Sequence, residues 1–191
     1  MKNQTEHVVL VDEANQPLGT TDKATVHTDA TPLHRGFSLF LFNSKGELLI
    51  QQRALTKKTW PGAWSNSVCG HPMINESAEA AAKRRLSYEL GIDVELDEVA
   101  MALPDYRYQC ERFGIIENEI CPVMVVFKDV EPDPNPDEVN ATDWVAWDEF
   151  QKRMAEPNEF SEWCVEETGL LAQNSDFQAA FDAFVKTPAT T

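Results

Sequence analysis

The sequence predicts a mixed α/β (α+β) fold, with a mixed β-sheet sandwich flanked by helices in one compact domain. Short runs of β-branched and aromatic residues end at Gly, Pro and Asn turns, which is typical of strands. One central segment has a capping residue at each end of a predicted helix, and the spacing of apolar residues in the C-terminal part predicts further helices. At roughly 100–200 residues per domain, the 191 residues suit one domain over 1–191. The 42% hydrophobic content is enough for a sizeable core.

The first third of the chain predicts a hairpin-rich sheet. Its expected elements are a strand over 6–12, a turn over 15–19, a strand over 34–42, a turn over 43–46 and a strand over 47–53. The last two strands form a predicted hairpin around the Asn-Ser-Lys-Gly turn. Residues 54–67 hold two Lys, two Trp, one Pro and one Gly, which indicates a functional loop.

The clearest helix covers residues 77–90. Ser77 can cap its start, Glu79 suits its first turn, and Gly91 supplies the stop. The packed face expected for this helix consists of Ala78, Ala81, Ala82, Leu86 and Leu90.

The second half alternates strands and helices. Strands are expected over 106–110, 117–128 and 142–147, with a loop at 112–114 between the first two. Prolines at 132, 134 and 136 interrupt the chain before the third strand. Helices are expected over 158–171 and 175–185, the second with Ser175 and Gln178 spaced as a capping box.

The net charge of −16 disfavours nucleic acid and anionic membrane surfaces as partners. It would also repel an anionic small molecule at long range. Because salt screens exposed charges beyond about 8 Å, a local basic pocket can outweigh the overall sign. Acidity of this kind otherwise favours solubility.

Compartment signals point to the cytoplasm. No apolar run reaches the roughly 18 residues of a membrane helix, and the N-terminal residues lack the apolar core of an export signal. The four cysteines form no CxxC pair and suggest neither a disulfide framework nor a zinc knuckle. We expect a cytoplasmic monomer without a membrane partner.

Imidazoles, carboxylates and one thiol form the candidate reactive centre. His71 precedes a proline, so its backbone is biased to be extended, which puts Cys69 and His71 on one face. Glu117 and Glu119 share a strand face for the same reason. The candidate metal ligands are His27, His34, His71, Glu117 and Glu119.

Such a mixed ligand set suits zinc, manganese or magnesium. The thiol beside it is a candidate proton donor or nucleophile. Spacing alone leaves the alternative open, in which the histidines are structural and the Glu-x-Glu pair lies on a solvated face.

Basic residues stand out in this acidic chain, and several flank the candidate centre. Lys and Arg suit phosphate oxygens, and the alternative is ordinary surface ion pairs worth about 0–1 kcal/mol each. Arg85 and Glu89, four residues apart on the helix, could pair with each other or meet a metal-bridged diphosphate. The basic set is Lys23, Arg53, Lys57, Lys58, Arg84 and Arg85.

The segment from Gly70 through Glu76 and Arg84 to Gly91 resembles the Nudix box. The match is degenerate, because Arg85 and Tyr88 stand where the pattern has glutamates. Losing anionic ligands weakens a site for hard cations, which argues against a pyrophosphate hydrolase.

Taken together, the chain is similar over nearly its whole length to type I isopentenyl diphosphate isomerases, in their compact bacterial form, a divergent branch of the Nudix superfamily. The most specific run is Asn-Ser-Val-Cys-Gly-His-Pro with Glu-Asn-Glu downstream. The segments that carry the resemblance are residues 21–27, 33–38, 52–58, 60–62, 64–72, 85–91, 106–108 and 117–119.

This resemblance implies the Nudix fold and a reversible isomerisation of isopentenyl diphosphate to dimethylallyl diphosphate. The five candidate ligands would bind one divalent metal, Mn²⁺, Zn²⁺ or Mg²⁺. Glu89 and the Cys69 carbonyl would hold a second ion, Mg²⁺, on the diphosphate. The implied diphosphate-binding residues are Lys23, Arg53, Lys57 and Arg85.

The resemblance also implies that Cys69 and Glu119 flank the isoprene carbons and move the two protons, with Tyr108 assisting Glu119. The reaction passes through a tertiary cation, which needs a dry site and a facing aromatic ring. Trp163 matches the family's aromatic, and Trp64 is a second candidate.

Several points stay open in the sequence. It does not decide which of Cys69 and Glu119 is the acid, and it does not identify the native metal. Cys110 and Cys121 are expected to be structural, and His7 has no evident role in the site. The main alternative function is a Nudix hydrolase of a nucleoside diphosphate derivative, and a third is a non-catalytic metal-binding module.

Overall fold

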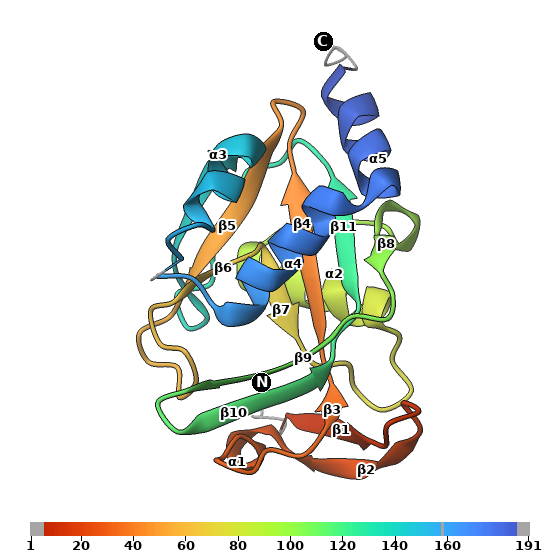
Figure 1. Cartoon of the computed structure of the whole chain (residues 1–191), viewed down its shortest axis with the longest axis vertical. Helices are drawn as coiled ribbons and strands as arrows, with labels where there is room; N and C mark the ends of the chain where they lie inside the picture. Colours follow the sequence, from red (N-terminus) through yellow and green to blue (C-terminus); the bar gives the residue numbers. More distant parts are fainter. Residues whose placement is uncertain (1–5, 158, 187–191) are drawn as a thin grey trace.

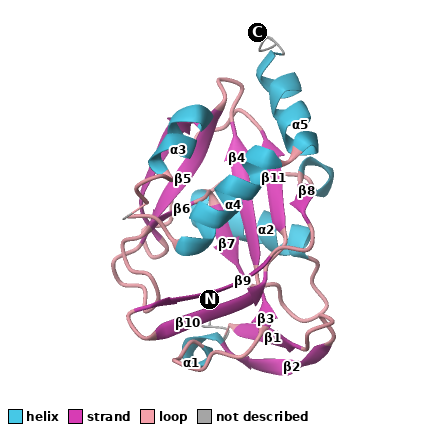
Figure 2. Cartoon of the chain, viewed as in Figure 1, coloured by secondary structure: helices cyan, strands magenta, loops and turns pink. Residues whose placement is uncertain are grey.

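The computed structural model describes residues 6–157 and 159–186. Residues 1–5, which belong to the segment tested for an export signal, and Asn158, where a helix was expected to begin, lie outside these ranges. The described residues form two mixed β-sheets flanked by helices, which confirms the predicted fold class (Figure 1, Figure 2). None of the described helices has both the length and the apolarity needed to cross a bilayer.

The smaller sheet has strand order β2-β1-β3-β10-β9. Its strands are β1 (His7–Val11), β2 (Pro17–Asp22), β3 (His34–Arg35), β9 (Arg107–Arg112) and β10 (Ile115–Ile120). Strands β9 and β10 form a long antiparallel hairpin, and β10 runs parallel to β3 with Glu119 opposite His34.

The larger sheet has strand order β12-β5-β4-β11-β8, with β6 added to β5 and β7 added to β4. Its strands are β4 (Phe37–Phe42), β5 (Glu47–Arg53), β6 (Trp64–Ser65), β7 (Val68–Gly70), β8 (Ala100–Leu103), β11 (Val123–Phe127) and β12 (Val139–Ala146). The predicted hairpin exists, because β4 and β5 pair antiparallel.

Helices cover both faces of the larger sheet, with α4 in front and α2 behind it in Figure 1. Alternate residues of β4 point to opposite faces, so Phe40 joins the core under α4 while Leu39 joins the core under α2. The helices are α1 (Lys23–Val26), α2 (Ala78–Leu90), the 3-10 turn η1 (Leu96–Glu98), α3 (Trp147–Arg153), α4 (Glu162–Gln173) and α5 (Ser175–Lys186).

Two predicted strands each prove to be two strands in different sheets. The 34–42 strand breaks at Gly36, and the 117–128 strand breaks at Cys121 and Pro122. A Cβ on Gly36 would lie 1.9 Å from Glu119 Oε2, so any other residue there would displace the Glu119 carboxylate. The two segments change sheets side by side, and this junction carries the candidate site.

Several boundaries also differ from expectation. The 15–19 turn is shorter, because Asn15 takes the positive φ of 59° and β2 already begins at Pro17. The 142–147 strand ends before Trp147, which starts α3. Helix α4 begins at Glu162 and not near residue 158.

The helix caps show one success and one error. Ser77 caps α2 by accepting from the Ala80 amide, and Gly91 ends the helix with φ of 64°, as predicted. The capping box at Ser175 is wrong, since the Asn174 side chain accepts from the Phe177 amide at 2.9 Å and caps α5. On α2, the predicted packed face is buried except for the half-buried Ala78.

Candidate active site

A cavity of about 560 Å³ opens where the two sheets meet. Of the thirteen predicted site residues, twelve line it, and His34 lies fully buried behind its wall. The predicted residues on the wall are Lys23, His27, Arg53, Lys57, Cys69, His71, Arg85, Glu89, Tyr108, Glu117, Glu119 and Trp163. The tertiary structure therefore brings together residues from seven separate segments of the chain.

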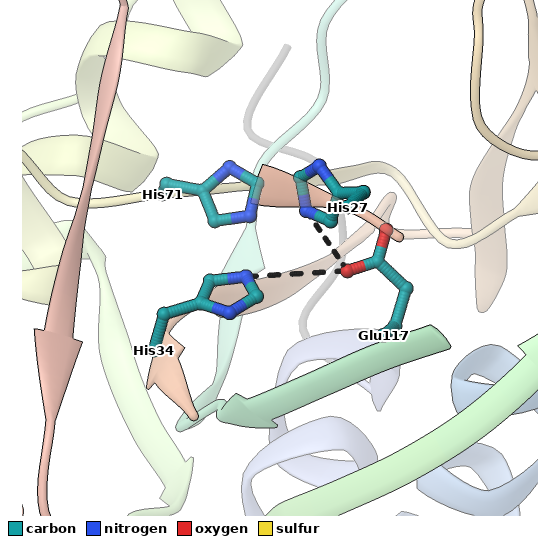
Figure 3. A group of neighbouring side chains, drawn as sticks. All are labelled: His27, His34, His71 and Glu117. Carbon is teal, nitrogen blue, oxygen red and sulfur yellow. Dashed lines mark ion pairs between the residues drawn. The ribbon is translucent and has the colours of Figure 1, made fainter. Parts of the chain in front are cut away.

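The three histidines and Glu117 converge at one end of the cavity (Figure 3). His27 follows α1, His34 belongs to β3, and His71 follows β7. One ligand atom from each of the four side chains lies within 4.8 Å of the others. The His27 Nε2 atom lies 3.1 Å from Glu117 Oε2, and the His34 Nε2 atom lies 4.0 Å from it.

Four buried atoms of this cluster lack a hydrogen-bond partner among the described residues: His27 Nε2, His34 Nε2, His71 Nδ1 and Glu117 Oε2. Burying a polar atom without a partner is costly. A divalent cation would supply the missing interaction, and imidazole with carboxylate is a suitable donor set. A 2.9 Å contact between His34 Nδ1 and the Pro32 carbonyl leaves Nε2 for the cluster. The residues present thus fit a bound metal.

Glu119 joins this cluster to the reaction cavity. Its Oε1 lies 2.9 Å from His71 Nε2 and 3.3 Å from His34 Nε2, and its Oε2 accepts from the Tyr108 hydroxyl at 3.2 Å. Burial would raise the pKa of Glu119, but its close contacts with His34 and His71 outweigh this effect and lower that pKa. Burial lowers the pKa of His71 to about 3, which keeps this imidazole in the neutral, metal-binding form.

Cys69 lies on β7 with its thiol in a hydrogen-bonded setting. Its Sγ donates to Asn66 Oδ1 at 3.0 Å and lies 3.4 Å from Ser38 Oγ. Burial, and then the charge of Glu167, raise the pKa of Cys69 to about 12. The other cysteines, Cys110, Cys121 and Cys164, are also free thiols.

The part of the cavity wall that carries Lys23, Lys57 and Arg85, here called the basic end, has its cations already paired. Lys23 Nζ lies 2.6 Å from the Glu6 carboxylate, and Lys57 contacts Glu138. The Arg85 guanidinium contacts three carboxylates: Glu89 at 2.6 Å, Glu138 at 2.8 Å and Glu6 at 3.3 Å. The Arg85–Glu89 ion pair expected as one alternative therefore exists. Arg53 instead donates to the Thr59 carbonyl at 3.1 Å.

Trp163 supplies an aromatic wall from α4. Its ring lies 5.8 Å from that of Tyr108 and 5.3 Å from that of Trp60, centroid to centroid. Trp64, the second aromatic candidate, is not among the described residues that line the cavity, so this expectation is wrong. The ring of Trp60 packs on Trp163 from behind in an edge-on contact.

Sequence reasoning missed four residues of the site. Glu6 and Glu138 neutralise the basic end, and Ser38 and Glu167 lie behind Cys69. Ser38 sits within a segment that the resemblance covers, but the other three had no motif to signal them. Arg84 lies at the α2 surface and holds Glu76 with two bonds of 2.8 Å, which ties the preceding loop to the helix.

Comparison with known proteins agrees with this architecture. The family described as NUDIX domain matches residues 32–164. Among solved structures, the Deinococcus radiodurans protein DR0079 superposes with a TM-score of 0.67 at 22% identity, covering 89% of this chain and 99% of that one. A MutT protein from Methanosarcina mazei gives 0.56 at 18% identity over 82% and 97% of the two chains. These likenesses establish the Nudix fold.

Curated relatives are much more similar in sequence. A protein from Corynebacterium efficiens is 46% identical over 192 residues, covering 96% of this chain and 98% of the relative. One from Klebsiella pneumoniae is 45% identical, covering 94% and 96%, and one from Saccharopolyspora erythraea is 45% identical, covering 88% and 87%. All three relatives are named isopentenyl-diphosphate Delta-isomerase.

Proposed function

The chain belongs to the isopentenyl-diphosphate Delta-isomerases of the Nudix domain family, and from this premise we propose which of its residues carry the reaction. The enzyme isomerises isopentenyl diphosphate to dimethylallyl diphosphate. The observation that carries our assignment is one cavity lined by a thiol, a histidine-bound carboxylate, an aromatic wall and a basic end.

We propose that Cys69 and Glu119 perform the two proton transfers. The alkene carries no activating group, so a proton must be added to carbon to give a tertiary cation, and another proton must then be removed. A positioned acid or base contributes about 10²–10⁴-fold to such a step. Tyr108, which donates to Glu119 at 3.2 Å, orients that carboxylate.

The Trp163 ring is the proposed partner of the cationic carbons. Desolvated cation–π contacts reach about 2 kcal/mol or more. A water-free cavity also protects the cation from capture as an alcohol. The packing of Tyr108 and Trp60 against Trp163 supports this role, because both contacts help to fix the ring.

The metal site is proposed to consist of His27, His34, His71, Glu117 and Glu119. The four unpartnered buried atoms in this cluster support it. A bound divalent cation would lower the pKa of a neighbouring carboxyl and make a proton held there more acidic. Zinc, manganese and magnesium all suit these donors.

The basic end is the proposed diphosphate site. Lys23, Arg53, Lys57 and Arg85 would contact its oxygens, and Glu89 with the Cys69 carbonyl would hold Mg²⁺ against it. Their presence on one cavity wall supports this assignment. Lys and Arg suit phosphate oxygens, Arg in bidentate fashion.

The decisive experiment is turnover of isopentenyl diphosphate with Mg²⁺ in D₂O. We expect an acid-labile allylic diphosphate that carries deuterium. An allylic product without deuterium would contradict protonation by exchangeable groups such as Cys69. Release of phosphate or a nucleoside monophosphate from nucleoside diphosphate derivatives would favour hydrolysis, which lacks support because Arg85 and Tyr88 replace carboxylates.

Three further properties are proposed with this function. The chain acts as one domain, since two segments pass directly from one sheet to the other at Gly36 and Pro122. It acts as a monomer, which size-exclusion chromatography with light scattering would test. It works in the cytoplasm, in keeping with four free cysteines.

A further inference from the structure

Three side chains outside the cavity form a hydrogen-bonded cluster at the start of α4. The Trp60 indole donates from Nε1 to Glu162 Oε2 at 2.6 Å, and the Arg112 guanidinium donates from Nε to Glu162 Oε1 at 2.9 Å. Arg112 Nη2 also donates to the Phe160 carbonyl at 2.7 Å. We call Trp60, Arg112 and Glu162 the clasp. None of the three is among the described residues that line the cavity, and the proposed reaction gives Arg112 and Glu162 no role.

The clasp joins three segments that each contribute to the cavity wall. It connects the loop of residues 54–63, the end of β9 and the start of α4. Each segment carries or adjoins a cavity-lining residue within three positions of its member of the clasp, and these residues are Thr59, Ile115 and Trp163. In the sequence the clasp hydrogen bonds span 102 and 50 residues. The clasp therefore holds together parts of the wall that lie far apart along the chain.

The backbone of Trp60 has an uncommon conformation. Its φ of 48° lies in the left-handed region, which bulky residues rarely adopt. Such a conformation persists only where the surrounding structure fixes it, and it is concentrated at functional positions. Here the indole is 3% exposed, donates to Glu162 and meets the Trp163 ring edge-on, with 5.3 Å between centroids. The Glu162 carboxylate thus orients a ring that packs directly on the proposed partner of the cation.

Glu162 also ties this indole to the β9–β10 hairpin. A carboxylate has two oxygens, and here one accepts from the indole while the other accepts from the Arg112 guanidinium. Strand β9 also contributes Tyr108, whose ring lies 5.8 Å from that of Trp163. Trp163 thus has two aromatic neighbours from different segments, and the clasp links both segments to the start of its own helix.

We propose that Glu162 is a positioning residue that acts through Trp60 and Arg112 to hold the Trp163 ring and to close this side of the cavity to water. This inference deepens the proposed function and rests on the proposed role of Trp163. A displacement of about 1 Å at a reacting site can cost about 100-fold in rate. A loosened wall would also admit water. Water would add its oxygen to the tertiary carbon and give up one proton, so the by-product would be a tertiary alcohol diphosphate equal to substrate plus one water.

Three variants and a matched control test the proposal. Glu162→Leu removes both acceptors, Arg112→Gln removes the guanidinium, and Trp60→Phe keeps a ring but removes the indole donor. The control is Arg107→Gln, because Arg107 is on the same strand and pairs with Glu13, and neither residue is among the described residues that line the cavity. The measurements are kcat and KM for isopentenyl diphosphate, the share of alcohol in the product, and Tm.

We expect Glu162→Leu to lower kcat about tenfold to a hundredfold, and Arg112→Gln and Trp60→Phe to lower it about threefold to tenfold. KM should stay within about threefold in all of them, because the cation forms only after the substrate has bound. Glu162→Leu should also release a measurable share of alcohol, which the wild-type protein should not. Arg107→Gln should keep the wild-type kcat and product.

Thermal stability separates positioning from a merely structural role. The Arg112 and Glu162 side chains are 22% and 37% exposed, and such ion pairs contribute little to stability, so Arg112→Gln should lower Tm by no more than about 4 °C. A wild-type kcat in folded Glu162→Leu overturns the proposal, and if that variant does not fold, a wild-type kcat in Arg112→Gln does so. An equal loss in Arg107→Gln also overturns it. A lower kcat without alcohol supports the positioning of the ring and overturns the closure to water.

Indole NMR signals test the clasp independently of isomerase activity. The five tryptophans each give one Nε1–H signal, and Trp60→Phe and Trp163→Phe identify the two that matter. In Glu162→Leu the Trp60 proton should move upfield and exchange faster with solvent, because its hydrogen bond is lost, and the Trp163 signal should move as its ring shifts. An unchanged Trp163 signal overturns the positioning role even in an active isomerase. Wild-type protein without isomerase activity would overturn the proposed function, while a moved Trp163 signal would still support the clasp.

Discussion

The two ends of the cavity satisfy their charges in opposite ways. At the histidine end, four buried polar atoms have no hydrogen-bond partner among the described residues. At the basic end, every one of Lys23, Lys57 and Arg85 is held by at least one carboxylate. The histidine end therefore has room for a cation, whereas the cations of the basic end are already neutralised by carboxylates of the chain.

The histidine end is a preformed site, whereas binding at the basic end requires internal ion pairs to be exchanged for contacts with the ligand. The histidine cluster is already shaped and gains an interaction when a cation binds. In the proposed diphosphate complex, Glu6 or Glu138 would be released so that Arg85 and the lysines face the diphosphate fully. Part of the attraction to the substrate is therefore offset by ion pairs that are lost. The following changes test this contrast, from the largest expected effect to the smallest.

Replacing Cys69 by Ala should have the largest effect on the rate and should leave both the histidine end and the basic end unchanged. We expect the rate to fall by about 10²–10⁴-fold or more, the range for a lost general acid or base, with fold and metal content kept. Cys110→Ala is the matched control, because Cys110 is a partly buried thiol of β9 that is not among the described residues lining the cavity. A wild-type rate in Cys69→Ala would refute its catalytic assignment.

Removing one imidazole should break the preformed end. His27→Ala should lower bound metal and reduce the rate by at least about 100-fold, since even indirect contacts to a ligand are worth 10–100-fold. Elemental analysis of the purified protein measures the metal directly. The control is His7→Ala, which replaces a histidine on β1 outside the cluster and should change neither the bound metal nor the rate. Full metal occupancy in His27→Ala would remove this histidine from the ligand set.

Neutralising Glu89 should weaken the basic end at low Mg²⁺. Glu89→Gln loses the charge that faces Arg85 at 2.6 Å and is proposed to hold Mg²⁺. A lost charged contact is worth about 1.5–3 kcal/mol, or about tenfold or more in KM. Titration of the rate with Mg²⁺ measures it, and a magnesium dependence equal to wild type would count against the role of Glu89.

Neutralising Glu138 should have the smallest effect, and it should strengthen diphosphate binding where the other changes impair function. Glu138→Gln frees Lys57 and Arg85 from an internal competitor, so we expect diphosphate binding about threefold tighter, which is about 0.6 kcal/mol. Inorganic pyrophosphate in a calorimetric titration is a suitable probe. Glu98→Gln, whose carboxylate pairs with Lys128 away from the cavity, is the control. Weaker binding in Glu138→Gln would show that this carboxylate supports the site and does not compete for it.

Local patterns in the sequence determined the elements that depend on neighbours in the chain. The caps of α2 at Ser77 and Gly91 and the hairpin strand Glu47–Arg53 follow from residues within a few positions of each other. The specific motif around Cys69 and His71 identified the site residues through the family they resemble. These features need no information on which distant segments meet.

Only the tertiary structure decided how those segments combine. The patterns within residues 34–42 and 117–128 did not show that each strand divides between two sheets, because the division depends on which distant strands each half pairs with. The partners of Arg85 likewise include Glu6 and Glu138, which lie 79 and 53 residues away from it in the sequence. Glu167 is one of many acidic residues in the sequence, and only the tertiary structure buries it fully. Burial and ion pairing arise between segments brought together by folding, so no local pattern encodes them.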